Sequence, residues 1–139
     1  MVNQRFNCAV HIMTALAFHR EQMGSRSLAL SINTNPVVVR RLVLALRDAG
    51  LVKTSVGRCG GARLAIPARR ITLLNIYHAI EPRPVIPMGK RKPWRHCPVS
   101  CNMKFVMSPV VAAVEKAVRR RLREISLEQL VHAIERNQE

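Results

Sequence analysis

Acidic and aromatic residues are both scarce in this sequence of 139 residues. There are 8 Asp and Glu residues against 23 Lys and Arg residues, which gives a formal net charge of +15 at pH 7. A positive surplus of this size predicts an anionic partner. Aromatic residues make up only 4% of the chain, which argues against single-stranded RNA, because its recognition usually relies on aromatic stacking platforms. Duplex nucleic acid is therefore the favoured partner.

Long hydrophobic runs are also missing. Those present, such as Cys8–Ile12 and Leu28–Ile32, are far too short to span a bilayer. The first six residues contain no apolar segment with a small-residue cleavage site. We therefore expect no membrane partner and a cytoplasmic location. In such a reducing compartment the four cysteines are expected to be thiols or ligands instead of structural disulfides.

The common catalytic motifs are absent as well. The sequence contains no P-loop, His-Glu-x-x-His or nucleophile-elbow pattern, and its carboxylates are scattered. Cys59 lies beside Arg58 in a glycine-rich segment, but a phosphatase-type loop would need an arginine at the position of Ala65. We expect that the protein is not an enzyme.

Two helical patterns joined by a three-residue polar turn are the most informative feature. Residues 25–32 are predicted to form a short helix with Ser25 or Ser27 as N-cap. Asn35-Pro36 predicts the start of a second helix, with an N-cap followed by proline at the first helical position. Gly50 is expected just after its end. Its predicted buried face consists of Val38, Val39, Leu42, Ala45 and Leu46. This layout is typical of a helix-turn-helix.

A β-hairpin is predicted directly after the second helix. Residues 51–56 and 62–66 have strand character, and the glycine-rich segment 57–61 between them suits a hairpin tip. A hairpin in this place is the wing of a winged helix-turn-helix. A further helix is expected over 71–80, with Thr72 as N-cap and Glu81-Pro82 as its stop.

The remainder of the chain predicts an irregular basic segment and then a long amphipathic helix. Cys97-Pro98 opens this helix, which is expected to reach about residue 123. Pro109 either kinks it or starts a new helix capped by Ser108. Residues 126–129 match a capping box for a short terminal helix.

These patterns predict a mainly α fold with a small β-hairpin wing. We expect three parts: a winged helix-turn-helix DNA-binding domain over 1–81, a basic, proline-rich connector over 82–101 that holds Cys97 and Cys101, and a dimerisation helix followed by the short terminal helix over 102–139.

In order and spacing, the sequence resembles the Rrf-type winged-helix transcriptional regulators, the family of the iron–sulfur-cluster regulator and the nitric-oxide-sensing repressor. The segments that carry the resemblance are Asn33–Leu42, Ala49–Val52, Gly60–Ala65, Ile71–Tyr77, Cys97–Asn102 and Ile125–Leu130. The resemblance implies a homodimer, held by the long C-terminal helix, that represses or activates genes at a roughly palindromic operator.

Two departures from the family pattern concern the wing and the connector. The family wing usually contains Arg-Gly-Pro-Gly-Gly-Gly, whereas here the arginine has moved to Arg58. Cluster-binding members carry three cysteines in the connector. Cys97 matches the last of them, but Val85 and Arg91 occupy the upstream positions. An iron–sulfur cluster of that form cannot be assembled from connector cysteines alone, so we expect no cofactor.

The predicted DNA contacts lie in the helix-turn-helix and the wing. They are Ser27, Asn35, Val37, Arg40, Arg41, Arg58 and Arg63. Asn35 is predicted to bind a phosphate or a base at the helix N-terminus. The sequence leaves open whether Arg40 and Arg41 reach guanine edges or phosphates. Arg58 and Arg63 are predicted to enter the minor groove.

Three interpretations of Cys97 and Cys101 remain open. They are small buried residues, or redox-sensing thiols together with Cys8, or ligands of a metal or cluster that recruits Cys8 and His11. A thiol at a helix start among basic residues is reactive, so redox sensing has as much support as the buried-residue interpretation, and we expect no metal. The predicted function is a sequence-specific DNA-binding repressor that acts as a homodimer under thiol control. The alternative is a non-specific basic nucleic-acid-binding protein.

Overall fold

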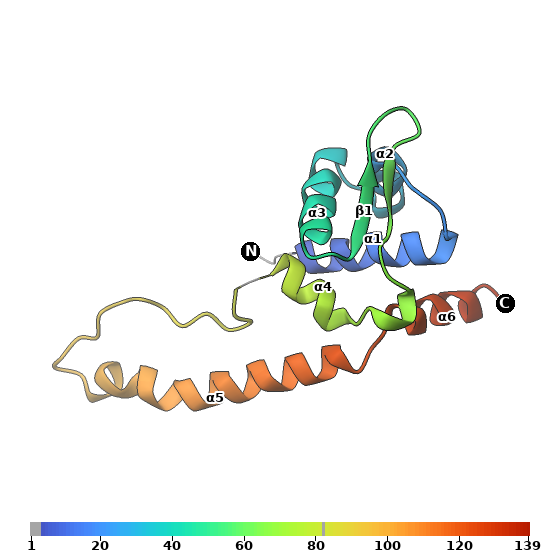
Figure 1. Cartoon of the computed structure of the whole chain (residues 1–139). Coiled ribbons are helices and arrows are strands. Elements are labelled where there is room, and N and C mark those ends of the chain that lie inside the picture. Colours follow the sequence, from blue (N-terminus) through green and yellow to red (C-terminus); the bar gives the residue numbers. More distant parts are fainter. Residues whose placement is uncertain (1–3, 82) are drawn as a thin grey trace. The chain divides into compact units, whose positions relative to one another are not determined.

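The computed structural model describes residues 4–81 and 83–139 (Figure 1). Pro82 of the predicted helix stop and the first half of the segment inspected for a signal sequence lie outside the described residues. The chain divides into two compact units, one formed by Met1–Pro82 with Leu122–Glu139 and the other by Arg83–Arg121. Within the described ranges, no helix combines the length and apolar character needed to cross a membrane.

The first unit is a winged helix-turn-helix, which confirms the predicted fold class. Its elements in chain order are α1 (Arg5–His19), α2 (Ser25–Ile32), α3 (Pro36–Asp48), β1 (Val52–Ser55), β2 (Gly61–Leu64), a 3₁₀ turn (Ala68–Arg70), α4 (Leu73–Ile80) and α6 (Leu127–Asn137). The core lies among the helices, where Ile12, Leu28, Leu46 and Ile76 are fully buried. Burial of these side chains against one another holds the two helices of the helix-turn-helix on α1 and α4.

The start of α3 agrees with its prediction, whereas part of its buried face does not. Asn35 is the N-cap, and its side-chain oxygen accepts a hydrogen bond from the Val37 N–H at 2.8 Å, followed by Pro36 at the first helical position. Val38, predicted to be buried, is 38% exposed, and Val43 is buried in its place. At 3.6 residues per turn, position 43 lies closer than position 38 to the stripe defined by the other buried residues.

The predicted N-cap of α2 is wrong. Gly24 occupies that position with an extended backbone and no side-chain cap, so Ser25 is already helical. The reason is tertiary: Met23 and Ala62 form an isolated antiparallel bridge with two hydrogen bonds of 2.9 Å. The chain therefore stays extended through Met23 and turns into the helix directly afterwards. Ser27 lies exposed in the first turn.

The wing is a two-stranded antiparallel sheet in which Val52 pairs with Leu64 and Lys53 pairs with Arg63. Gly61 tolerates the close approach of the Met23 segment, because a Cβ at this glycine would lie 2.4 Å from the Met23 carbonyl oxygen. The wing is thereby joined to the chain just before α2.

Two capping boxes begin α4 and α6, and both have the N-cap that the sequence predicts. Thr72 caps α4 together with Asn75, and Ser126 caps α6 together with Gln129. Thr72 and Ser126 also form an isolated bridge. The start of α6 is therefore fastened to the start of α4.

The second unit consists of the connector and most of α5 (Pro98–Arg123). Pro109 lies inside this one continuous helix, so the alternative of a new helix capped by Ser108 is wrong. The Ser108 hydroxyl instead donates to the Lys104 carbonyl at 2.6 Å. Glu115 holds the connector by accepting hydrogen bonds from the backbone N–H groups of Val85 and Ile86.

Candidate nucleic-acid interface

The solvent face of α3 carries both apolar and basic side chains. Val37, Arg41 and Leu44 are four and three residues apart, so they lie on one face of the helix. Val37 and Leu44 are each 46% exposed, and Arg41 is exposed as well. We call these three residues the α3 crest. It lies opposite the buried face and is available to a partner.

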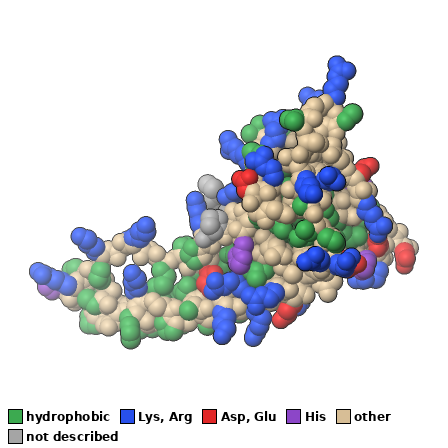
Figure 2. Space-filling model, in the orientation of Figure 1, with side chains coloured by type: hydrophobic (Ala, Val, Ile, Leu, Met, Phe, Trp, Pro, Cys, Tyr) green, Lys and Arg blue, Asp and Glu red, His purple; other side chains and the backbone are tan. Residues whose placement is uncertain are grey.

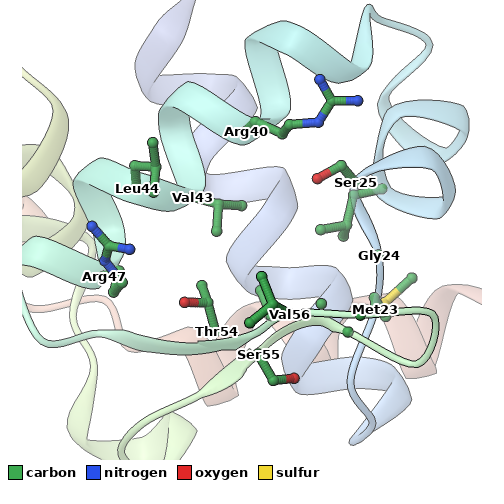
Figure 3. A pocket seen from close by; sticks show the side chains of 15 residues that line it. Met23, Gly24, Ser25, Arg40, Val43, Leu44, Arg47, Thr54, Ser55 and Val56 are labelled. Atoms are coloured by element: carbon green, nitrogen blue, oxygen red, sulfur yellow. The ribbon is translucent and has the colours of Figure 1, made fainter.

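A groove of about 540 Å³ separates α3 from the wing (Figure 3). Arg40 and Arg47 lie along its α3 side, and Val56 lies on the wing side. Arg47 is paired with the neighbouring Asp48 at 3.2 Å, and both side chains are exposed. The Arg40 side chain extends toward α2. The α3 side of this groove is therefore basic, whereas its wing side is not.

The wing adds further positive charge. Arg58 is exposed in the loop and Arg63 is exposed on β2. Lys53, which sequence reasoning missed, lies directly opposite Arg63 in the strand register. In Figure 2, Lys or Arg atoms project at the loop end of the wing, and separate groups of Lys and Arg atoms lie over the body of the winged helix. Counting the strands back from the glycine-rich tip would have revealed the Lys53–Arg63 pair.

A second residue that sequence reasoning missed is Gln22. Its side-chain NH₂ donates to the Cys59 carbonyl, and its side-chain oxygen accepts from the Ser55 hydroxyl at 3.0 Å. This one side chain therefore joins both ends of the wing loop to the segment before α2. No local pattern signals this role, because the partners are more than thirty residues away.

Of the predicted redox residues, Cys97 and Cys101 lie together, at the start of α5, and line a hollow of about 730 Å³ between that helix and the connector. Ser100 N–H donates to Cys97 Sγ at 3.5 Å, and Cys101 Sγ donates to the Trp94 carbonyl at 3.6 Å. Cys97 is partly buried and Cys101 is exposed, which does not fit the interpretation of two small buried residues. Cys8 is partly buried in α1 of the other unit. All four cysteines are free thiols.

The donor set does not fit an iron ion or an iron–sulfur cluster held by this chain alone. In residues 4–81 and 83–139, no three His, Cys, Asp or Glu side chains come together in a way that could hold a metal. His96, next to Cys97, packs edge-on against Trp94, and His11 hydrogen-bonds to Ser31 at 2.9 Å. Two thiols are fewer donors than a four-coordinate site requires.

A helix-turn-helix followed by a hairpin, with arginines on the recognition helix and the wing, defines a winged-helix DNA-binding protein. Comparison with known proteins agrees. The Rrf2 family, described as "Iron-dependent Transcriptional regulator", matches residues 2–133. The chain belongs to the Rrf2 family and is a DNA-binding transcription regulator and not an enzyme.

Individual relatives match along most of their length. YwnA of Bacillus subtilis strain 168, described as an HTH-type transcriptional regulator, is 30% identical over 132 residues, which cover 95% of this chain and 98% of YwnA. The structure of IscR from T. potens superposes with a TM-score of 0.74 at 23% identity, covering all of this chain and 91% of IscR. CymR, the global cysteine regulator of B. subtilis, gives a TM-score of 0.71 at 23% identity, covering 96% of this chain and 97% of CymR. At this identity the two structures support the fold alone.

Proposed function

We propose that the protein is a homodimeric, sequence-specific repressor that acts in the cytoplasm. The N-terminal half of α3 enters the major groove, and the wing contacts the adjacent minor groove with Arg58 and Arg63. The observation that carries this proposal is the presence of exposed arginines on both α3 and the wing, the two elements that line one groove. A dimer bound over a promoter represses by occupying the DNA that the polymerase needs.

The remaining predicted contacts fit the same docking. Asn35 and Ser27 are exposed at the first turns of α3 and α2. Helix N-termini present backbone N–H groups to phosphates. In a helix-turn-helix the first helix crosses the DNA backbone. We therefore assign Asn35 and Ser27 to phosphates at the edge of the major groove.

The dimer is proposed to form through α5. This helix has a single buried residue, Val111, among the residues described for it. Its exposed side includes an apolar stripe with alternating four- and three-residue spacing: Val99, Met103, Val106, Val110, Ala113 and Ala117. Such spacing is that of a coiled-coil seam. A second copy of α5 would cover this stripe and set the distance between the two recognition helices.

Thiol chemistry at Cys97 and Cys101 is proposed to control DNA binding. A peroxide oxidises one thiol to a sulfenic acid and is itself reduced to water. The second thiol then displaces water from the sulfenic acid to form the disulfide. Helical residues four apart have Cα atoms about 6 Å apart, so bridging distorts the first turn. The hydrogen bond from Ser100 to Cys97 Sγ would be lost. Cys8 is a third candidate for this redox role.

Selection from random duplexes at about physiological salt tests the proposal. Enrichment of a palindromic sequence is the expected result. Retention of an unselected pool, with an affinity that depends only on salt, would replace it with the non-specific basic binder. Arg41→Ala is expected to weaken specific binding, and Arg136→Ala is a matched control, because Arg136 is an exposed arginine on α6.

A further inference from the structure

We propose that the α3 crest recognises a thymine methyl group through Val37 and a guanine through Arg41, whereas Arg40 contacts the sugar–phosphate backbone. This inference deepens the proposed function and rests on its premise that α3 enters the major groove. It assigns separate roles to two adjacent arginines that the sequence alone does not distinguish.

The first step concerns Val37. It is the second residue of α3, and its backbone N–H is already bonded to the Asn35 side chain. Its side chain is 46% exposed, on the face of the helix that points away from the core. Nearly half of this apolar side chain is therefore left uncovered by its own chain, at the leading turn of the recognition helix. In the major groove, the apolar group that it can contact is the C5 methyl of thymine.

The second step separates Arg41 from Arg40. Arg41 lies one helical turn after Val37 on the crest, so the surface that contacts Val37 also faces Arg41. Arg40 lies about 100° around the helix from Arg41. Unlike Arg41, it lines the groove beside the wing, and its side chain is directed toward α2. Since the first helix of the motif crosses the backbone, Arg40 faces phosphates. Arg41 faces base edges, where a guanidinium forms two hydrogen bonds with guanine O6 and N7.

The neighbouring charges support Arg40 as the main backbone contact on this flank. Arg47, the other arginine of the groove, already pairs with Asp48 at 3.2 Å. Part of its charge is therefore balanced within the protein. Arg40 lines the same groove nearer the helix N-terminus, where DNA approaches.

The spacing of the crest restricts the operator. Val37 and Arg41 are four residues apart, a rise of about 6 Å along the helix. Successive bases of one strand are about 3.4 Å apart. We therefore expect the thymine and the guanine to lie within about two base-pair steps of each other in each half-site.

Chemical substitution of the selected operator tests the assignment. Replacing thymine with deoxyuridine removes only the methyl group, and replacing guanine with 7-deazaguanine removes only the N7 acceptor. For the wild-type protein, deoxyuridine at one thymine position per half-site is expected to lower operator affinity about fourfold per protomer, the value of one buried methyl group. 7-Deazaguanine at one guanine position per half-site is expected to lower affinity roughly 10- to 150-fold, the value of one hydrogen bond to a charged group.

The variants connect each base to its side chain. The operator affinity of Val37→Ala should not change when the sensitive thymine is replaced with deoxyuridine. The affinity of Arg41→Ala should likewise not change when the sensitive guanine is replaced with 7-deazaguanine. Arg40→Ala should keep both sensitivities, bind all duplexes less tightly and reduce the salt slope by about 0.9 per protomer. Val38→Ala is the matched control, because Val38 is exposed on another side of the same helix; it should keep the wild-type pattern.

The outcomes separate this inference from the function on which it rests. If a palindrome is selected but deoxyuridine has no effect at any position, or if guanine sensitivity disappears in Arg40→Ala and persists in Arg41→Ala, the crest assignment is wrong while the regulator stands. If no motif is selected, the proposed function itself fails. Far-UV circular dichroism of each variant ensures that lost binding does not reflect lost folding.

Discussion

At the scale of single residues, Asn35 combines a structural and a functional contribution that substitutions can separate. Its side-chain oxygen satisfies the Val37 N–H, one of the donors that a helix start leaves without a helical partner. The same residue lies exposed at the helix end that is proposed to meet phosphates. Capping depends on the acceptor oxygen, whereas phosphate binding is sensitive to charge.

Asn35→Ala is expected to lower the free energy of unfolding by about 1 kcal/mol, because the cap is lost. Asn35→Asp keeps an acceptor at the N-cap and should retain the stability, but its carboxylate repels phosphates and should weaken operator binding. Urea unfolding and operator titration measure the two effects. Equal stability of Asn35→Ala and the wild type would show that the cap contributes nothing.

At the scale of elements, the position of the wing is determined by the segment that precedes α2. The bridge between Met23 and Ala62 and the two hydrogen bonds of Gln22 hold the base and the loop of the hairpin. Since this segment also leads into the first helix of the motif, the wing and the helix-turn-helix are linked. Arg58 is therefore presented at a defined distance from α3.

Gln22→Ala removes both hydrogen bonds to the wing loop. It is expected to free the loop and to lower operator affinity about 5- to 30-fold, the value of one to two net hydrogen bonds. Amide exchange over residues 55–61 should become faster, while exchange in α1 and α4 should not change. Gln138→Ala makes the same chemical change at the exposed end of α6 and should bind as the wild type does. Unchanged wing exchange in Gln22→Ala would mean that Gln22 does not hold the wing.

The elements that depend on neighbouring residues could be predicted from the sequence. Asn35-Pro36, the cap at Thr72 and the capping box at Ser126 define helix starts through contacts within three residues. The N-cap Gly24 could not be predicted, because a strand-like contact from the distant wing determines it. The same holds for Gln22 in the site. Periodicity predicted the helix faces only approximately. Val38 was predicted to be buried but is exposed, and Val43 is buried, because a run of apolar residues fits more than one assignment of the buried face.

At the scale of the whole molecule, the proposed dimer depends on the apolar stripe of α5. This 26-residue helix has one buried side chain among its described residues, so contacts within the chain leave the stripe exposed. The stripe runs from Val99 to Ala117 and its spacing fits a helix–helix seam. Association would also place two DNA-binding surfaces on one particle, which gives a palindromic operator two contacts at once.

Val106→Glu is expected to dissociate the dimer, because association would bury two unpaired carboxylates at the seam. Light scattering should give the mass of one chain, 15.7 kDa, in place of twice that mass. Operator binding should fall more than tenfold through the loss of the second half-site. Ala112→Glu adds the same charge at an exposed position of α5 outside the stripe and should remain dimeric. A dimeric Val106→Glu would assign the interface to another surface.

The thiol pair lies where a chemical change can reach the proposed interface, since Cys97 immediately precedes α5 and Cys101 lies in its first turn, with the Cys101 N–H bonded to the Cys97 carbonyl. Peroxide is expected to change the operator affinity of the wild type about 5- to 150-fold, the usual range of coupling between two sites. The disulfide should appear as the loss of two hydrogen atoms from the intact mass. The double variant Cys97→Ser, Cys101→Ser should show neither change.

Cys59→Ser should respond as the wild type does, although Cys59 is exposed in the wing itself. If Cys59→Ser removed the response and the double variant kept it, oxidation would act directly at the DNA contact and not through α5.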